Sequence, residues 1–140
     1  MEISLVPPDG IDYVYDEVLE LLQEVPTYTN GRYQPEDMLE ICRTGGTSLL
    51  WVALDKDFKI MGVVITTIAH YPRAKMLFAQ YVGGKHLSKW KRPMYNKLER
   101  FAYGQGLDGI EGAGRLGWAR LLSMNLVGFF MERFFDGRRI

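Results

Sequence analysis

Runs of apolar and β-branched residues predict six strands along the chain. Two of them, residues 48–54 and 59–69, are separated by the polar turn 55–57, and this pattern predicts a β-hairpin. A third strand follows the turn at 70–73, so three antiparallel strands are expected in succession. The complete set of strand candidates is residues 2–6, 48–54, 59–69, 75–82, 107–112 and 126–135.

Apolar residues at spacings of three and four predict helices between these strands. The first helix has Asp9 or Asp12 as its N-cap and reaches about residue 24. The second begins at Pro35 and continues to the glycines at 45–46, and a short helix around Trp118 precedes the last strand. The expected order is β-α-α-β-β-β-α-β-α-β. This is an α/β (α+β) chain without repeats or linkers, which we interpret as a single domain over residues 1–140.

Residues 75–106 form the most informative stretch. A strand is followed by Gly83 and Gly84, which admit positive φ and allow another backbone or a ligand to come close. A helix with Ser88 as its expected N-cap then begins. Its amides, with Lys85 and Lys89 nearby, predict an anion site, so Gly84→Val is expected to impair anion binding more than stability. The alternative is a plain glycine turn before an amphipathic helix with a solvated basic end.

Composition narrows the classes of protein. The hydrophobic fraction of 47% and the aromatic fraction of 13% exclude a disordered chain. Seventeen basic and seventeen acidic residues cancel, so nucleic acid and anionic membranes are not expected partners. The single cysteine, Cys42, excludes an internal disulfide and is expected to be buried, and no metal site is expected. Prolines 7 and 8 interrupt the N-terminal apolar run, which is unlike a signal peptide, so we expect a cytoplasmic protein.

The polar and aromatic segment 26–34 separates the first two predicted helices. Loops carried by a rigid scaffold often form binding sites. We therefore treat Tyr28, Arg32 and Tyr33 as substrate-binding candidates. Packing of these side chains on the protein surface is an equally open alternative.

The element order resembles the GNAT superfamily of N-acetyltransferases over nearly the whole chain. More narrowly, YVGGKHLSKW at 81–90 and FAYGQGLDGIEGAGRLGWARLL at 101–122 are similar to small GNAT-like proteins of tailed bacteriophages and prophages. A Gly-Arg-x-Gly-Trp element follows the fifth strand in those proteins, and Gly114, Arg115, Gly117 and Trp118 match it here. The resemblance implies a mixed, mostly antiparallel sheet flanked by helices, with the fourth and fifth strands diverging at 82–83.

The resemblance also implies where acetyl-coenzyme A would bind. In the family it inserts between the fourth and fifth strands, which puts pantetheine along Gln80, Tyr81 and Val82. The pyrophosphate would then lie on residues 83–88, namely Gly83, Gly84, Lys85, His86, Leu87 and Ser88.

Acetyl transfer to an amine needs a base, a donor for the carbonyl oxygen and an acid. The fifth strand has two carboxylates, Asp108 and Glu111, and Glu111 is the candidate base because it lies nearer the expected opening between the strands and has the longer side chain. The amide of Tyr81 or Val82 is the candidate for polarising the thioester carbonyl. Tyr81 is also a candidate acid, and Arg115 and Trp118 are further substrate-binding candidates. For Glu111, an outward-facing strand residue paired with Arg115 is the open alternative; for Trp118, it is a place in the core.

Three features depart from the family pattern. The glycines are adjacent instead of following Gln/Arg-x-x-Gly-x-Gly/Ala, and Pro93 removes an amide bond from the pyrophosphate helix, which predicts a kink or a late start. Many members carry a tyrosine on the last helix, where this chain has only the hydroxyl of Ser123. A degenerate donor site is therefore one of the alternatives.

Two functions from different classes are therefore expected. One is an N-acyltransferase that moves acetyl from acetyl-coenzyme A to an amine of a small molecule or a protein. The other is a non-catalytic virion or host-interaction protein of a phage. The sequence leaves the identity of the amine and the oligomeric state open, with a homodimer among the alternatives.

Overall fold

The computed structural model describes residues 1–23, 32–112, 124, 133, 135 and 136. Most residues of the predicted helix around Trp118 and of the predicted strand 126–135 lie outside this set. The described elements are β1 (Glu2–Val6), a short 3-10 helix (Pro8–Gly10), α1 (Ile11–Leu21), α2 (Pro35–Arg43), β2 (Ser48–Leu54), β3 (Ile60–His70), β4 (Lys75–Gly84), α3 (Leu87–Gly104) and β5 (Gly109–Gly112). Within the described residues no helix has the length and apolarity needed to span a bilayer.

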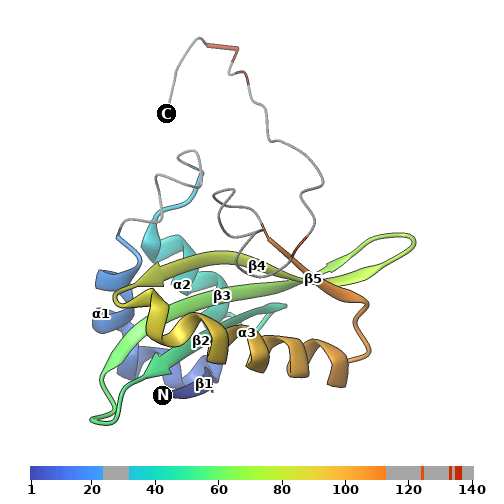
Figure 1. Ribbon diagram of the computed structural model, residues 1–140. Helices are drawn as coiled ribbons and strands as arrows, with labels where there is room; N and C mark the ends of the chain where they lie inside the picture. Colours follow the sequence, from blue (N-terminus) through green and yellow to red (C-terminus); the bar gives the residue numbers. More distant parts are fainter. Residues whose placement is uncertain (24–31, 113–123, 125–132, 134, 137–140) are drawn as a thin grey trace.

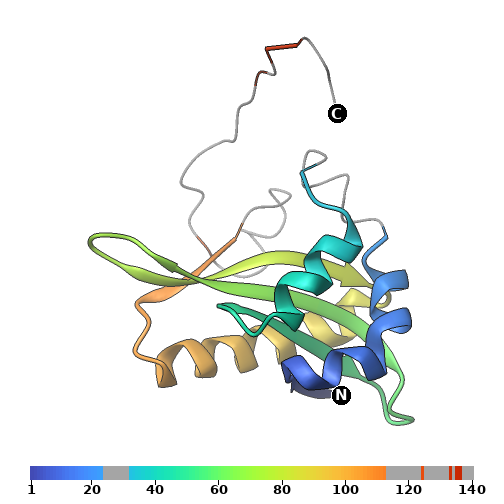
Figure 2. The same cartoon turned by 180° about the vertical axis from the view of Figure 1, so that it is seen from behind.

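The strands form one five-stranded sheet in the order β1-β2-β3-β4-β5. The first four strands are antiparallel to their neighbours, whereas β5 pairs parallel to β4. A parallel neighbour requires a crossover connection, and α3 supplies it. Helices α1 and α2 lie against one face of the sheet and α3 against the other (Figures 1 and 2). This arrangement confirms the predicted mixed, mostly antiparallel sheet flanked by helices.

Side chains alternate between the two faces of the sheet and form two apolar clusters. Along β2, Leu50 and Val52 face the α1/α2 side, whereas Trp51 and Ala53 face α3. The α1/α2 cluster includes Val18, Leu22, Met38, Leu39, Cys42, Val63, Ile65 and Tyr81. The α3 cluster includes Val64, Leu77, Trp90, Met94, Leu98 and Ala102. The buried residues of α3, Trp90, Met94, Leu98 and Ala102, recur at a spacing of four, which agrees with the helical pattern in the sequence.

The helix N-termini differ from the prediction at two places. Helix α1 begins after Gly10 without a side-chain cap, so neither Asp9 nor Asp12 caps it. Helix α3 begins at Leu87 after His86, whose φ of 55° is left-handed, so Ser88 is not its N-cap. The N-cap, His86, therefore lies two residues before the predicted serine cap.

The start of α2 and the course of α3 bear on two further expectations. Helix α2 begins at Pro35 as predicted, with a capping box in which the Gln34 amide donates to Asp37 Oδ2 at 2.9 Å. Pro93 lies inside the helix that starts at Leu87, so this helix does not start late.

The glycine pair does not interrupt β4, contrary to the prediction. Gly83 and Gly84 stay in the strand and face Val63 and Gly62 of β3. Gly84 has a φ of 136°, and a Cβ there would lie 2.4 Å from the carbonyl oxygen of Met61. Glycine is therefore required at 84 because the β3 backbone approaches it closely.

A tryptophan fixes the start of α3 to the end of β4. The ring of Trp90 lies over Gly62, where a Cβ would be 2.3 Å from the ring atom Cε2. Trp90 is buried, and its Nε1 donates to the carbonyl oxygen of Lys85 at 2.8 Å. The amide of Lys85 in turn donates to the carbonyl oxygen of Met61 at 2.8 Å. Strand β3 thus determines where α3 begins.

We expect Gly84→Val to lower the free energy of unfolding by about 2 kcal/mol or more, because the new side chain must displace the β3 backbone at an unfavourable φ. Urea denaturation measures this loss. Gly104→Ala is the control, since a Cβ at 104 meets nothing within 4 Å. A Gly84→Val protein as stable as the wild type would contradict the close packing of β4 on β3.

We expect the thiol of Cys42 to be unreactive in the native protein. Burial raises the pKa of Cys42 from 9.0 to about 11, and the thiolate is the reactive form. Native protein at about pH 8 should therefore react with Ellman's reagent far more slowly than urea-unfolded chain. Because the folded pKa is raised, the corresponding stability is complete below pH 9.0 and is lost as the pH rises towards about 11. Fast labelling of folded protein would instead indicate an accessible nucleophile.

Candidate functional site

Strand β4 continues beyond its last pair with β5. The β4–β5 ladder runs from Met76–Gly109 to Ala79–Gly112, whereas β4 itself extends to Gly84. A bulge at Gln80 coincides with this point, because Thr66 pairs with Ala79 and Ile65 with Tyr81. Bulges commonly bend a strand and end its pairing. Within the described residues, the last pair is therefore three positions before the predicted divergence at 82–83.

The register of β3 and β4 shows which main-chain groups of β4 face away from β3. The Lys85 amide donates to Met61, and donors of an antiparallel strand alternate in direction. The amides of Gly83 and Tyr81 therefore point to β3, whereas those of Val82 and Gly84 point to the β5 side. Of the two candidates for polarising a carbonyl, only the Val82 amide has the required direction.

The N-terminus of α3 lies directly after this edge. The first amides of a helix have no partner inside the helix, which applies here to Leu87 and Ser88. The Lys89 amide already donates to the carbonyl oxygen of His86 at 2.9 Å, and the Lys85 amide is held by β3. Of the segment predicted to hold pyrophosphate, Leu87 and Ser88 thus supply suitable amides, and exposed Lys85 and Lys89 supply positive charge.

Tyr81 lies in the α1/α2 cluster beside the bulge. It is 5% exposed, and its hydroxyl accepts a hydrogen bond from Gln80 Nε2 at 3.1 Å. The ring of Tyr33 packs edge-on against it, with 5.6 Å between centroids. Burial raises the pKa of Tyr81, so this phenol holds its proton more tightly than a free tyrosine does. Its role as an acid stays a prediction.

Glu111 lies on β5 opposite Phe78, one position before the last β4–β5 pair. It accepts a hydrogen bond from the hydroxyl of Tyr71, which belongs to the turn between β3 and β4. The Glu111 carboxylate raises the pKa of Tyr71 because it stabilises the protonated phenol. The expected alternative partner, Arg115, lies outside the described residues. The contact with Tyr71 joins positions 40 apart in the sequence, so no local pattern could predict it.

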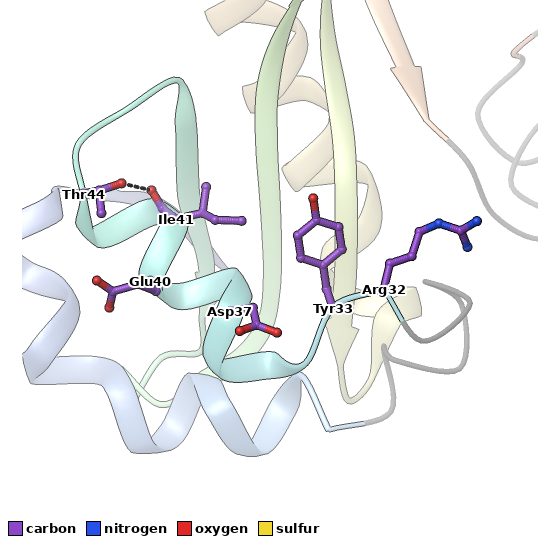
Figure 3. Close-up of a pocket in the computed structure, with 6 residues that line it drawn as sticks. All are labelled: Arg32, Tyr33, Asp37, Glu40, Ile41 and Thr44. Carbon is purple, nitrogen blue, oxygen red and sulfur yellow. Dashed lines mark hydrogen bonds between the residues drawn. The ribbon is translucent and has the colours of Figure 1, made fainter. Parts of the chain in front are cut away.

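An open pocket of about 550 Å³ lies on the α2 side of the sheet (Figure 3). Its lining residues come from the segment before α2 and from α2 and its end: Arg32, Tyr33, Asp37, Glu40, Ile41 and Thr44. Arg32 and Tyr33 were predicted from sequence to bind substrate, whereas the carboxylates were not. Tyr28 and Trp118 lie outside the described residues. Because Tyr33 also contacts Tyr81, the pocket borders the bulge in β4.

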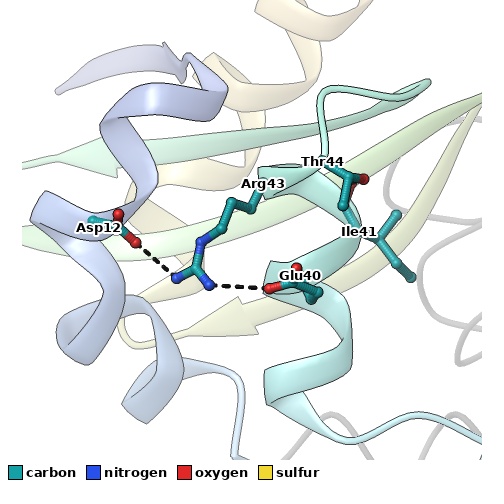
Figure 4. A network of polar contacts seen from close by, with 5 residues as sticks. All are labelled: Asp12, Glu40, Ile41, Arg43 and Thr44. Carbon is teal, nitrogen blue, oxygen red and sulfur yellow. Dashed lines mark hydrogen bonds and ion pairs between the residues drawn. The ribbon is translucent and has the colours of Figure 1, made fainter.

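Arg43 supports the wall of this pocket (Figure 4). Its Nη2 is 2.7 Å from Asp12 Oδ1 on α1, and its Nη1 is 3.0 Å from Glu40 Oε2. The guanidinium also lies over the ring of Tyr15, 5.2 Å from its centroid. These exposed ion pairs contribute little stability, but they fix the orientation of Glu40 and join α1 to α2.

No protein-family model and no curated protein matches the sequence. Solved structures are similar to it. A tetramutant of the BH1408 protein from Bacillus halodurans has a TM-score of 0.72 at 16% identity, over 95% of this chain and 99% of that one. A possible acetyltransferase from Clostridium difficile has a TM-score of 0.69 at 11% identity, over 95% of each chain.

A third structure has a named activity. Glucosamine-6-phosphate N-acetyltransferase from Arabidopsis thaliana has a TM-score of 0.65 at 15% identity, over 96% of this chain and 98% of that one. These three proteins are named from two bacteria and a plant, and the matches show no phage connection. Similarity at such low identity establishes architecture and not activity. The chain has the fold of the GNAT-type acetyltransferases.

Proposed function

We propose that this protein is an N-acyltransferase that moves acetyl from acetyl-coenzyme A to an amine of a small molecule or a protein. One observation supports the proposal above the others. The edge of β4 from Gln80 to Gly84 has no β5 partner within the described residues, and it leads directly into the N-terminus of α3. A strand edge can pair with amides, and a helix N-terminus attracts phosphate. Acetyl-coenzyme A contains amides, in its pantetheine arm, and phosphates.

The residues fit this donor in part. The outward amides of Val82 and Gly84 suit the amide-containing pantetheine, and the first amides of α3 suit pyrophosphate. Two predicted contacts do not fit, because the amides of Gly83 and Lys85 face β3. The space above Gly84 is taken by Met61, so this glycine is no evidence for a bound phosphate. The proposed pyrophosphate contacts are thus restricted to Leu87, Ser88 and the lysines around them.

The proposed reaction is direct attack of a neutral amine on the thioester carbon. A nitrogen–carbon bond forms while the proton of the amine moves to the carboxylate of Glu111. The Val82 amide stabilises the charge that develops on the carbonyl oxygen. The carbon–sulfur bond then breaks, and the coenzyme A thiolate takes a proton from Tyr81 or from water. Glu111 finally releases its proton to solvent, and Tyr81, where it has acted as the acid, takes a proton from solvent.

The pocket in Figure 3 is the proposed acceptor site. Tyr33 connects it to Tyr81, next to the strand edge proposed for the thioester. Asp37 and Glu40 give the pocket negative charge, which would attract an amine in its protonated form. The bound amine then releases one proton to solvent before it attacks in its neutral form. Arg32 adds a positive charge to the lining of the same pocket.

A non-catalytic binding protein with the same fold is the second candidate. The use of the Gly83 and Lys85 amides within the fold favours it, because a reduced set of phosphate contacts weakens donor binding. The two candidates differ in one measurable property, which is affinity for acetyl-coenzyme A.

We expect calorimetric titration to show that the protein binds both acetyl-coenzyme A and coenzyme A. Lys89→Glu should weaken this binding about three- to tenfold, because it reverses a charge at the N-terminus of α3. Lys97→Glu makes the same change about 12 Å further along the helix and should have little effect. Absence of binding by the wild-type protein would favour the non-catalytic candidate.

We expect Glu111→Gln to lower acetyl transfer by roughly 10²–10⁴-fold, the usual contribution of a general base. The affinity for acetyl-coenzyme A should stay near that of the wild type, because the amide keeps the shape of the side chain. The measurement is steady-state kinetics with a panel of amines, in which the released coenzyme A is quantified. A variant as active as the wild type would remove Glu111 from the mechanism but leave the enzyme in place.

A further inference from the structure

The turn between β3 and β4 makes a side-chain contact with β5. Tyr71 follows the last residue of β3, and its amide donates to the carbonyl oxygen of Ala74 at 2.8 Å, which closes the turn. Its hydroxyl donates to Oε1 of Glu111. A residue outside the β4–β5 edge therefore holds the carboxylate that lies beside that edge.

The chain just before β5 is joined to the same hairpin by two further hydrogen bonds. The Asp108 amide donates to the carbonyl oxygen of Lys75 at 2.7 Å, and the Lys75 amide donates to Asp108 Oδ2 at 2.8 Å. The parallel ladder then begins at Met76–Gly109. These bonds fix the register of β5 against the hairpin. Two sets of contacts therefore place Glu111 near Tyr71: the bonds between Asp108 and Lys75, which set the register of β5, and the hydrogen bond from the Tyr71 hydroxyl.

We propose that Tyr71 is a positioning residue for Glu111, holding its carboxylate where β4 and β5 part so that the second oxygen accepts the proton of the acceptor amine. This inference rests on the proposed acetyl transfer. Tyr71 acts only through Glu111 and does not touch the substrate. The proton moves from the amine nitrogen to Oε2 of Glu111, while the phenol keeps its own proton.

Few other groups compete for this carboxylate in the described part of the chain. Phe78 lies opposite Glu111 on β4, and its neighbours Leu77 and Ala79 are apolar. Ile110 belongs to the α3 cluster, so by strand alternation Glu111 faces away from α3. The charged or titratable groups next to Tyr71 are His70, Arg73 and Lys75, and within the described residues none forms an ion pair with Glu111.

The test is Tyr71→Phe, which keeps the ring and removes the hydroxyl. Without the phenol, the carboxylate of Glu111 loses the hydrogen-bond donor that orients it. The loss of rate should therefore appear in kcat, with the KM for the amine near that of the wild type, because Tyr71 does not bind the amine. At about neutral pH, kcat/KM should fall about three- to tenfold, with the affinity for acetyl-coenzyme A unchanged. Tyr13→Phe, at a tyrosine that is 87% exposed on α1, is the matched control.

Two further measurements separate positioning from a structural role. At a fixed neutral pH, the carbon-13 chemical shift of the Glu111 carboxyl should change in Tyr71→Phe, independently of activity, because the carboxylate loses its hydrogen-bond donor. In the Glu111→Gln background, Tyr71→Phe should cause no additional loss of rate, because both changes act on one group.

Each unfavourable result has a distinct meaning. An unchanged kcat in Tyr71→Phe, an unchanged carboxyl chemical shift of Glu111, or losses that add in the double variant would overturn the positioning role and leave the enzyme. A wild-type protein that neither binds acetyl-coenzyme A nor transfers acetyl would overturn the proposed function, and the positioning role with it.

Discussion

The arrangement of the candidate site depends on the close approach of two backbones, where Gly84 of β4 lies on Met61 and Gly62 of β3. Neither glycine has room for a Cβ. A Cβ at Gly62 would collide with the ring of Trp90, and a Cβ at Gly84 would collide with the carbonyl oxygen of Met61. Trp90 therefore lies directly on β3 and donates to Lys85. The start of α3 is thus held by a contact that tolerates almost no change in volume.

This contact fixes the side of β4 that pairs with β3. The opposite side of β4 pairs with β5. Along β3, strand β4 is paired to its last residue, and the bulge at Gln80 adjusts its register once. Along β5, the pairing seen within residues 1–23 and 32–112 covers Met76 to Ala79. One strand therefore belongs to a continuous antiparallel sheet and also presents outward amides beyond the end of a short parallel ladder. The direction of the Val82 amide is a consequence of the β3 register alone.

Local patterns in the sequence predicted the elements well, because each depends on nearby residues. β1, β2 and the start of α2 agree with the prediction, since apolar runs and a proline in the first turn are short-range signals. The sequence could not show why residue 84 is glycine. Glycine is required where a ligand comes close to the backbone and equally where a neighbouring strand does, and here the neighbour is β3. The N-cap of α3 was also missed, because His86 in a left-handed conformation replaces the serine cap. Tyr71 was missed because its partner lies on a strand that α3 separates from it in sequence.

Asp37 has two roles, one in capping α2 and one in lining the pocket. Its carboxylate accepts the Gln34 amide and so completes the capping box of α2, and the same side chain lines the pocket. The charge of the pocket is therefore coupled to the integrity of a helix. Under the proposed function, a change of acceptor preference that acts through this position is restricted to side chains that still accept that amide, with asparagine as the neutral choice. Glu40 does not cap a helix. Among proteins with this fold, substitutions that change acceptor preference would therefore be tolerated more readily at Glu40 than at Asp37.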